Sequence, residues 1–385
     1  MKIRKAYKYR IYPTKAQVTN FENQFSMCRH LYNWSLKERS EAYKQGQQKV
    51  SYAIQQNALP SLKQARPWFK GVHSQVLQDV LKRLDNAYQA FFRRVKAGEE
   101  PGYPKFKKRG QWTSITFPQY TKRPTNSVYI PKVGTVQCVL HREIPEDVRI
   151  KTLTISKEGG KWFASFSVEY DRSIEHKEGL PPLAIDLGLN DYVFASNGFR
   201  CSYPRALRNS QQRLKRLQRR FAKAKKRSRQ WYTLLRAIQK THFRVTCQRQ
   251  DFLHKTVNTL LEQTDCLIHE DLPIANMLRR PKAKQDETGL YLPNGACRVK
   301  GLHLSIADAA WGTFLSILKY KAQEQGKHCI PVNPRGSSQE CVCGYPVKKT
   351  LSNRVHECPK CGLVENRDYV SSLVLLRRGL ATLAA

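Results

Sequence analysis

A short apolar segment that ends in an acid constrains the fold of this chain more than any other feature. Residues 183–185 are Leu, Ala and Ile, and Asp186 follows them directly. A run of this kind is typical of a strand that is buried on both faces, and such a strand does not normally end on an uncompensated charge. Asp186 is therefore expected either to cap a turn or to hold a cation.

Two further acids are placed in a similar way. Residues 266–268 form a second short apolar run that leads to Glu270, and Asp368 lies just ahead of a helical run over residues 370–380. Three acids at the ends of separate elements can converge in space, and convergent carboxylates repel one another unless a positive charge lies between them. Hard oxygen ligands favour Mg²⁺ or Mn²⁺. The sequence therefore predicts that Asp186, Glu270 and Asp368 hold a metal pair suited to hydrolysis of phosphodiesters.

The balance of charge points to the kind of partner. The 385 residues include 68 Lys and Arg against 30 Asp and Glu, which gives a formal net charge of +38. Self-repulsion on this scale destabilises a compact monomer, so the composition indicates a polyanionic partner. Hydrophobic residues make up 40% of the chain, which excludes a disordered chain and fits two or three globular domains. A ribosomal-type or chromatin-type binder is the alternative that charge alone leaves open.

The sequence also bears on location. No apolar run approaches the roughly 18 residues that a membrane helix needs, and the charged N-terminus lacks the apolar core of a signal peptide. We therefore expect no membrane partner and a reducing intracellular compartment.

Four of the eleven cysteines cluster near the C-terminus. Cys358 and Cys361 form a Cys-x-x-Cys pair followed by Gly, in which backbone amides can turn toward the sulfurs. Cys341 and Cys343 are separated by one residue, which strains a shared tetrahedral site. The pattern favours a structural Zn²⁺ over free thiols, with His356 as an alternative ligand.

The remaining periodicities predict the order of elements. Alternation over residues 3–11 predicts a strand, and a capping box over residues 14–17 begins a helix. A stronger apolar stripe predicts a helix over residues 74–98. Residues 113–170 are β-rich, with a hairpin at Gly159-Gly160, and can pair with the N-terminal strand. The helical block would then be an insertion.

Two basic segments are candidates for nucleic-acid contact. Residues 101–110 interleave basic residues with aromatics, which suits phosphate contact and base stacking, although a solvated loop would have the same composition. Residues 205–229 contain twelve Lys or Arg and no acid, with apolar residues at helical spacing, which favours a helix that faces nucleic acid. Helices over residues 231–262 and 302–325 and a strand over 328–332 complete an α/β order.

Five motifs occur in an order that resembles a known family. They are the segments Ala184-Ile185-Asp186-Leu187-Gly188-Leu189, His269-Glu270-Asp271-Leu272, Ser337-Ser338-Gln339-Glu340-Cys341, Cys358-Pro359-Lys360-Cys361-Gly362 and Asn366-Arg367-Asp368-Tyr369. Together with Tyr9-Arg10-Ile11-Tyr12-Pro13 and Tyr103-Pro104-Lys105-Phe106, they resemble the TnpB proteins of bacterial insertion sequences, which are relatives of the type V CRISPR effector nucleases. The resemblance spans nearly the whole chain.

The resemblance implies a fold of four parts, α/β plus β-barrel. These are a wedge-like β-barrel (residues 1–13 and 101–180), an inserted helical recognition domain (14–100), a RuvC-type, RNase H-like nuclease domain (181–335 and 367–385) and a zinc-binding insert (336–366).

The resemblance also implies an activity. It implies a transposon-associated, RNA-guided DNA endonuclease, with Asp186, Glu270 and Asp368 as catalytic acids and Mg²⁺ or Mn²⁺ as cofactor. Its partners would be a guide RNA from the transposon end and double-stranded target DNA with a target-adjacent motif, bound by a monomer. Asn366 departs from the family, which commonly has a second acid there.

The sequence leaves three other functions open. A nuclease-silent relative would occupy DNA through its guide and repress transcription. A transposase would carry out DNA strand exchange, and an RNA-binding structural protein would have no metal-dependent activity.

Overall fold

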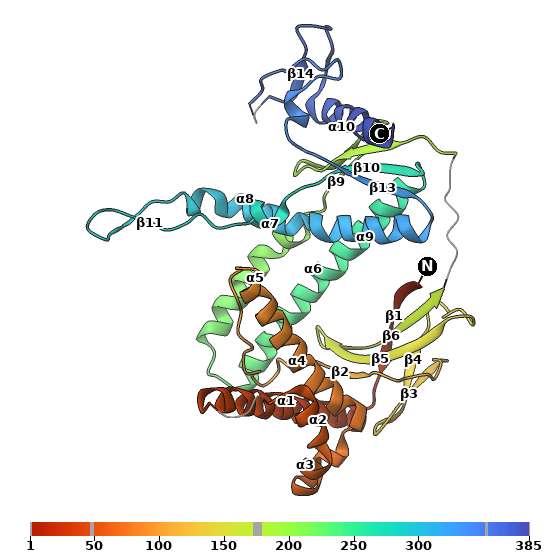
Figure 1. Ribbon diagram of the computed structural model, residues 1–385, viewed down its shortest axis with the longest axis vertical. Coiled ribbons are helices and arrows are strands. Elements are labelled where there is room, and N and C mark those ends of the chain that lie inside the picture. The colour runs from red at the N-terminus through yellow and green to blue at the C-terminus, as the bar shows by residue number, and fades with distance from the viewer. Residues whose placement is uncertain (1, 47–49, 172–178, 351–352, 385) are drawn as a thin grey trace. The chain divides into compact units, whose positions relative to one another are not determined.

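The computed structural model describes residues 2–46, 50–171, 179–350 and 353–384. The chain divides into two compact units, Met1–Arg172 and Ser173–Ala385 (Figure 1). Each unit has its own sheet and its own helices.

The first unit contains a six-stranded sheet. Its strands lie in the order β2-β5-β6-β1-β4-β3. Their bounds are β1 Lys2–Tyr12, β2 Ser114–Phe117, β3 Ser127–Ile130, β4 Gly134–Val139, β5 Arg149–Glu158 and β6 Lys161–Asp171. β1 pairs antiparallel with β6 on one side and β4 on the other, so the helices that follow β1 are inserted into a single sheet, as the sequence predicts.

The sheet curls into a half-barrel, which agrees in part with the expected wedge-like β-barrel. β2 and β3 are its two edges and do not pair with each other among the described residues. Arg83, on the helix Ser74–Lys96 (α4), contacts β2 and donates hydrogen bonds to Ser114 Oγ (3.1 Å) and Thr116 Oγ1 (2.7 Å).

The helical insertion begins as predicted. Thr14 Oγ1 accepts a hydrogen bond from Gln17 N, and Gln17 Oε1 accepts one from Thr14 N, which completes the capping box of α1 (Lys15–Lys44). The other helices are α2 Tyr52–Asn57, α3 Leu59–Ala65, η1 Pro67–Gly71 and α4 Ser74–Lys96. α1 shares the core of the sheet, since the ring of Phe21 stacks on Trp162 with centroids 5.0 Å apart.

The predicted hairpin between β5 and β6 is confirmed. Gly159 and Gly160 both have positive φ, at 56° and 80°, a conformation that glycine adopts without steric cost. A two-residue turn of this kind matches the twist of the flanking strands.

The second unit is a mixed sheet between helices. The strand order is β13-β10-β7-β8-β9, in which β13, β10 and β7 are parallel and β8 and β9 antiparallel. The strands are β7 Leu183–Asp186, β8 Asp191–Ala195, β9 Arg200–Ser202, β10 Cys266–Glu270 and β13 His328–Val332. Leu183, Ile185 and Leu267 pack into the core formed with α6 (Arg229–Leu261) and α9 (Trp311–Glu324). The buried Ala184 and Ile268 belong to a separate cluster with Leu375 of α10 (Arg367–Ala384). The predicted α/β order is therefore observed.

Two close approaches shape this unit. A Cβ atom on Gly379 of α10 would lie 2.4 Å from Ile268 Cδ1, so only glycine lets α10 approach β10 this closely. A Cβ atom on Gly188 would lie 2.6 Å from the carbonyl oxygen of Asp191, which explains the glycine in the turn that follows Asp186.

The predicted helix over residues 302–325 is two helices. α8 (Ala296–Ala309) ends at Ala310, whose φ of 54° is left-handed, and α9 begins at Trp311. Ala296–Glu324 as a whole is also long and apolar enough by composition to span a membrane, which corrects the expectation that no run approaches that length. Because Phe314 and Leu318 of α9 are fully buried in the protein core, its apolar character has an internal explanation.

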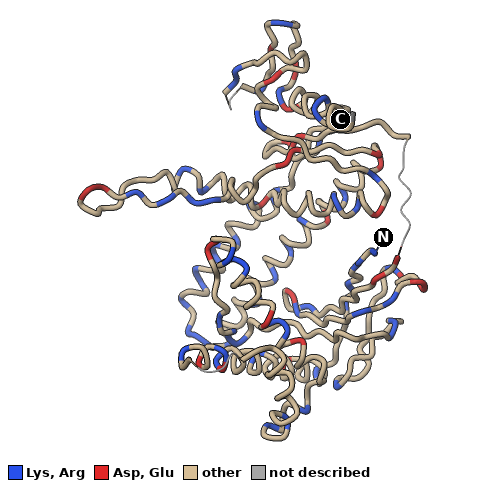
Figure 2. The backbone as a smooth tube through the Cα atoms, viewed as in Figure 1, with Lys and Arg blue, Asp and Glu red and all other residues tan. Residues whose placement is uncertain are grey.

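The acid-free basic segment is helical, as predicted, with α5 spanning Ala206–Lys223. Figure 2 shows Lys and Arg distributed along α5 and the turn into α6. Shorter elements complete the unit: α7 Ile274–Met277, β11 Lys284–Gln285, β12 Tyr291–Leu292, η2 Ser337–Gln339, β14 Val355–Glu357 and β15 Val364–Asn366.

Candidate metal centres

Strand register brings two of the predicted acids together. β7 and β10 are parallel, with Leu183 opposite Leu267 and Ile185 opposite His269. Asp186 and Glu270 are the next residues of the two strands, and each strand ends there. Because the carboxyl ends of adjacent parallel strands lie at the same edge of a sheet, the two carboxylates are neighbours.

Asp368 reaches the same edge from α10. Asn366 caps this helix, since its Oδ1 accepts hydrogen bonds from Asp368 N (2.8 Å) and Tyr369 N (3.3 Å). Asp368 therefore lies in the first turn, and Val370, Val374 and Leu375 on the same helix are fully buried. The residue that departs from the family pattern thus has a structural role here.

The electrostatics show that the three acids act on one another. The pKa of Asp186 is raised well above its usual value, first by burial and then by the charges of Glu270 and Asp368. The guanidinium of Arg367 and the backbone N–H of Leu187 oppose this shift. Asp186 is half-buried by its exposure to solvent, yet protein atoms enclose its carboxylate. Such unbalanced negative charge is what a divalent cation would relieve.

Glu270 is almost fully buried, and its carboxylate accepts a hydrogen bond from Ser337. Ser337 Oγ lies 2.9 Å from Glu270 Oε1 and 3.1 Å from the carbonyl oxygen of Pro334. Burial raises the pKa of Glu270, while the Ser337 hydrogen bond and the charge of Arg378 oppose the increase. Ser337 therefore favours the ionised form of this carboxylate.

Asp368 is paired with arginines. Its Oδ1 lies 3.1 Å from both Nε and Nη2 of Arg367, and its Oδ2 lies 3.7 Å from Arg354. Among the residues that the structure describes, the four cysteines described next lie close enough together to hold a metal ion, and the three acids are not part of such a group. The acids supply the hard oxygen donors that Mg²⁺ and Mn²⁺ prefer.

The four C-terminal cysteines form a compact cluster. The Sγ atoms of Cys341, Cys343, Cys358 and Cys361 all lie within 4.8 Å of one another. Cys341 is 3.6 Å from Cys361, and Cys343 is 3.7 Å from Cys358. The single residue between Cys341 and Cys343 therefore does not keep their sulfurs apart. Four thiols in this arrangement suit a closed, tetrahedral structural Zn²⁺ site.

His356 is not part of this cluster. Its ring is buried, and Nδ1 contacts the ammonium group of Lys349. The group that could hold a metal ion consists of the four cysteines and does not include His356.

Turn geometry supports thiolates in the cluster. Gly344 and Gly362 both have positive φ and close turns on Cys341 and Cys358 through 2.9 Å backbone hydrogen bonds. Burial opposes ionisation of Cys358, but the amides of Cys361 and Lys360 outweigh it and lower the pKa of Cys358 to about 6. Burial raises the pKa of Cys341 to about 12. A bound metal would favour the thiolate form of both cysteines and so remove the difference between their pKa values.

Arginines connect the cysteine cluster to α10. Arg377 donates to the carbonyl oxygen of Val342 (2.7 Å) and contacts Glu340. Arg378 donates to Glu340 Oε2 (2.6 Å) and to the carbonyl oxygen of Asn333 (2.9 Å). The segment that carries Ser337 is therefore fixed to the same helix that carries Asp368.

Sequence patterns do not predict the roles of Ser337 and Arg367. Ser337 lies four residues before Cys341, the first cysteine of the cluster, and Arg367 immediately precedes Asp368. Neither spacing nor composition indicates that a serine will meet an acid 67 residues away.

Three family models match the chain in order. The "Helix-turn-helix domain" of the IS605 OrfB group matches residues 1–48, which form β1 and α1 here. The IS605 OrfB model described as "Probable transposase" matches residues 165–280, and the "Cas12f1-like, TNB domain" matches residues 311–375.

Relatives align over the full chain. The "Putative RNA-guided DNA endonuclease InsQ" of Escherichia coli K12 is 29% identical, covering 100% of this chain and 94% of the relative. A "Putative RNA-guided DNA endonuclease" of Streptomyces pristinaespiralis is 29% identical, covering 99% of this chain and 91% of the relative.

A solved structure shares the fold. The Cas12f1 chain of a cryo-EM Cas12f1–sgRNA–target DNA complex has a TM-score of 0.56 at 12% identity, covering 97% of this chain and 99% of that one. Together, the ordered family models and the full-length relatives show that this chain is similar along its whole length to the OrfB proteins of IS605-type insertion sequences and to relatives named as RNA-guided DNA endonucleases.

Proposed function

We propose that this protein is a transposon-associated, RNA-guided DNA endonuclease that hydrolyses phosphodiester bonds with divalent metal ions. The observation that carries the proposal is the meeting of Asp186 and Glu270 at the ends of adjacent parallel strands, with Asp368 in the first turn of α10. The printed names of the relatives and the sgRNA and target DNA in the Cas12f1 complex support the same activity.

In this proposal the three acids hold the nuclease metals and are the catalytic residues. When bound, a pair of Mg²⁺ or Mn²⁺ ions activates a water and stabilises the leaving oxygen. Asp186 and Glu270 have raised pKa values, so a cation between them would favour their ionised forms. Ser337 orients Glu270, and Arg367 offsets the charge of Asp368.

The fold assignments follow from the same proposal. Residues 181–335 and 367–385 would form the RuvC-type nuclease domain, and residues 336–366 its insert, with Cys341, Cys343, Cys358 and Cys361 as ligands of a structural Zn²⁺. Residues 1–13 and 101–180 would form the wedge domain, and residues 14–100 the recognition domain.

The partners would be a guide RNA from the transposon end and double-stranded DNA with a target-adjacent motif, bound by one copy of the chain. A net charge of +38 suits a protein that holds an RNA–DNA heteroduplex by its backbone. The acid-free α5 is one surface for such contact. The complex would work in the cytoplasm, on the nucleoid.

Plasmid cleavage tests the proposal. The purified complex with its co-purifying RNA is incubated with Mg²⁺ and a plasmid that matches the guide. Asp186→Ala should abolish cleavage while RNA and DNA binding persist. The matched control is Asp251→Asn, which removes an exposed acid of α6 that pairs with Lys255 on the helix surface at 2.9 Å, and it should cleave normally. Full cleavage by Asp186→Ala would overturn the assigned chemistry, and binding without cleavage by the unmodified protein would favour a repressor.

A further inference from the structure

A cavity in the first unit lies outside both metal centres. It has a volume of about 300 Å³ and lies between α1, α4 and the segment that leads into β2. The residues that define it include Tyr32, Arg83, Lys107, Gln111, Trp112 and Ser114. This volume is at the lower end of the range for small-ligand sites.

Two aromatic rings and two cations line the cavity. The rings of Tyr32 and Trp112 lie 5.5 Å apart between centroids. The guanidinium of Arg83 lies 5.5 Å from the centroid of Trp112, and the ammonium of Lys107 lies 5.7 Å from that of Tyr32. Flat aromatic faces beside cations are suited to a ligand with a planar ring and a negative charge.

The cavity contains a donor that the protein leaves unused. Trp112 is 8% exposed, and its Nε1 has no hydrogen-bond partner among the described residues. A buried N–H group without an acceptor is unfavourable, so it points to an acceptor that the chain itself does not supply.

The two cations, Arg83 and Lys107, differ in whether their charged groups already have partners in the protein. Arg83 is engaged by Asp79 (2.7 Å) and by the hydroxyls of Ser114 and Thr116, so it serves the fold. Lys107 is held through its backbone instead, because its N–H donates to Asn33 Oδ1 (2.8 Å) and its carbonyl accepts from Asn33 Nδ2 (3.0 Å). Its ammonium group forms no ion pair among the described residues and is available to an anion.

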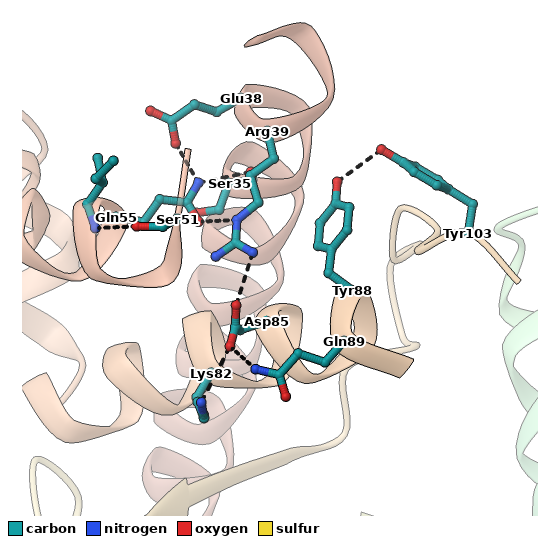
Figure 3. A network of polar contacts seen from close by, with 11 residues as sticks. Ser35, Glu38, Arg39, Ser51, Gln55, Lys82, Asp85, Tyr88, Gln89 and Tyr103 are labelled. Atoms are coloured by element: carbon teal, nitrogen blue, oxygen red, sulfur yellow. Dashed lines mark hydrogen bonds and ion pairs between the residues drawn. The ribbon is translucent and has the colours of Figure 1, made fainter. Parts of the chain in front are cut away.

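A partly buried polar network links α1, α2 and α4 (Figure 3). Arg39 of α1 is half-buried and donates to Asp85 Oδ1 of α4 (3.3 Å) and to Gln55 Oε1 of α2 (2.9 Å). Gln55 in turn donates to the carbonyl oxygen of Ser35 (3.0 Å). Arg39 lies two turns beyond Tyr32, so this network holds one wall of the cavity against the other.

The segment that carries Lys107 is also attached to α4. The hydroxyls of Tyr88 and Tyr103 lie 3.0 Å apart, as Figure 3 shows. Further along, Gln111 Oε1 accepts from Lys108 N (2.7 Å), and Gln111 N donates to the carbonyl oxygen of Lys108 (3.0 Å). The cavity is thus formed before any ligand arrives, which lowers the entropic cost of binding.

We propose that this cavity binds one nucleotide of a single-stranded segment of nucleic acid, with the base against Tyr32 and Trp112 and the phosphate at Lys107. An apolar ligand would leave the cation and the indole N–H without partners, whereas a nucleotide supplies a planar ring, acceptors and a negative charge together. The inference rests on the proposed function in one respect: the bound strand would belong to the guide RNA or to the target DNA.

Binding titrations with the full chain test this site. The probes are fluorescein-labelled ten-nucleotide RNA and DNA single strands in EDTA, with adenosine monophosphate and inorganic phosphate as competitors. Lys107→Gln and Trp112→Phe should each weaken binding of the single strands about tenfold. The matched control is Lys108→Gln, which removes the same charge from the adjacent, exposed residue and should change affinity less than about twofold.

The outcomes separate the alternatives. Restored affinity in Lys107→Arg, with unchanged melting temperatures, would support a contact with phosphate rather than a loss of folding. Equal affinity of Lys107→Gln, Trp112→Phe and Lys108→Gln would overturn the proposal, as would competition by inorganic phosphate as strong as that by the nucleotide. The assay contains no metal and no cleavage step. Failure of the proposed nuclease activity would therefore leave this result unaffected.

Discussion

Ser337→Ala is the most informative change at the acidic site. It removes the hydroxyl that lies 2.9 Å from Glu270 Oε1 and leaves the backbone of η2 unaltered. A hydrogen bond to a charged group contributes about 1.5–3 kcal/mol. At about 1.4 kcal/mol per factor of ten, its loss should slow DNA cleavage about 10- to 100-fold if Glu270 holds a nuclease metal.

The sign of the pH effect gives a second readout. The Ser337 hydrogen bond lowers the pKa of Glu270, against the upward effect of burial. Without it, Glu270 should stay protonated to higher pH and bind metal less readily. The acidic limb of the cleavage rate should therefore move to higher pH, and half-maximal activity should require more Mg²⁺.

The assay is plasmid cleavage by the RNA-loaded protein across pH and Mg²⁺ concentration. The matched control is Ser338→Ala, which removes the same hydroxyl from the adjacent, exposed residue. If Ser337→Ala and Ser338→Ala gave the same rate, pH profile and Mg²⁺ dependence, the hydrogen bond would have no part in positioning Glu270.

Three further predictions concern stability and metal content. Asp186→Asn should raise the melting temperature of the metal-free protein at pH 7–8 by a few degrees. The reason is that the raised pKa of Asp186 makes its ionisation unfavourable to folding as pH rises through that pKa. The same variant should lose the stabilisation that Mg²⁺ gives the unmodified chain. Gly379→Ala should destabilise the protein by about 1–3 kcal/mol in denaturant unfolding, because its Cβ atom would lie 2.4 Å from Ile268 Cδ1. Metal analysis of the purified chain should find one Zn²⁺, and Cys358→Ser should lose it together with protection of residues 336–366 from proteolysis.

Each of these has an opposing outcome. A melting temperature of Asp186→Asn equal to or below that of the unmodified chain would show that the carboxylate is not under electrostatic strain. Gly301→Ala, at an exposed helical glycine with nothing within 4 Å of its Cβ position, is the control for Gly379→Ala and should be neutral or stabilising. Absence of zinc from the pure protein would refute a structural Zn²⁺ site.

Local patterns in the sequence were sufficient for most of the elements and for the choice of site residues. The capping box at Thr14, the Gly159-Gly160 hairpin and the acids that end short apolar runs all depend on neighbours a few residues apart. Their free energies are set within a turn or a strand, so periodicity and residue type predict them. The four cysteines belong to the same class, because their spacing brings the ligands near one another.

Tertiary structure decided the features that depend on distant neighbours. Arg83 of α4 engages β2 at one edge of the first unit's sheet, and the helix expected over residues 302–325 is broken at Ala310. Ser337 meets Glu270, and Tyr32 meets Trp112, only because strands and helices far apart in the chain pack together. A side-chain hydrogen bond between such residues leaves no period or spacing in the sequence. The sequence by itself therefore determined which residues this protein offers for chemistry, and the long-range packing of α10, β7 and β10 determined which of them meet.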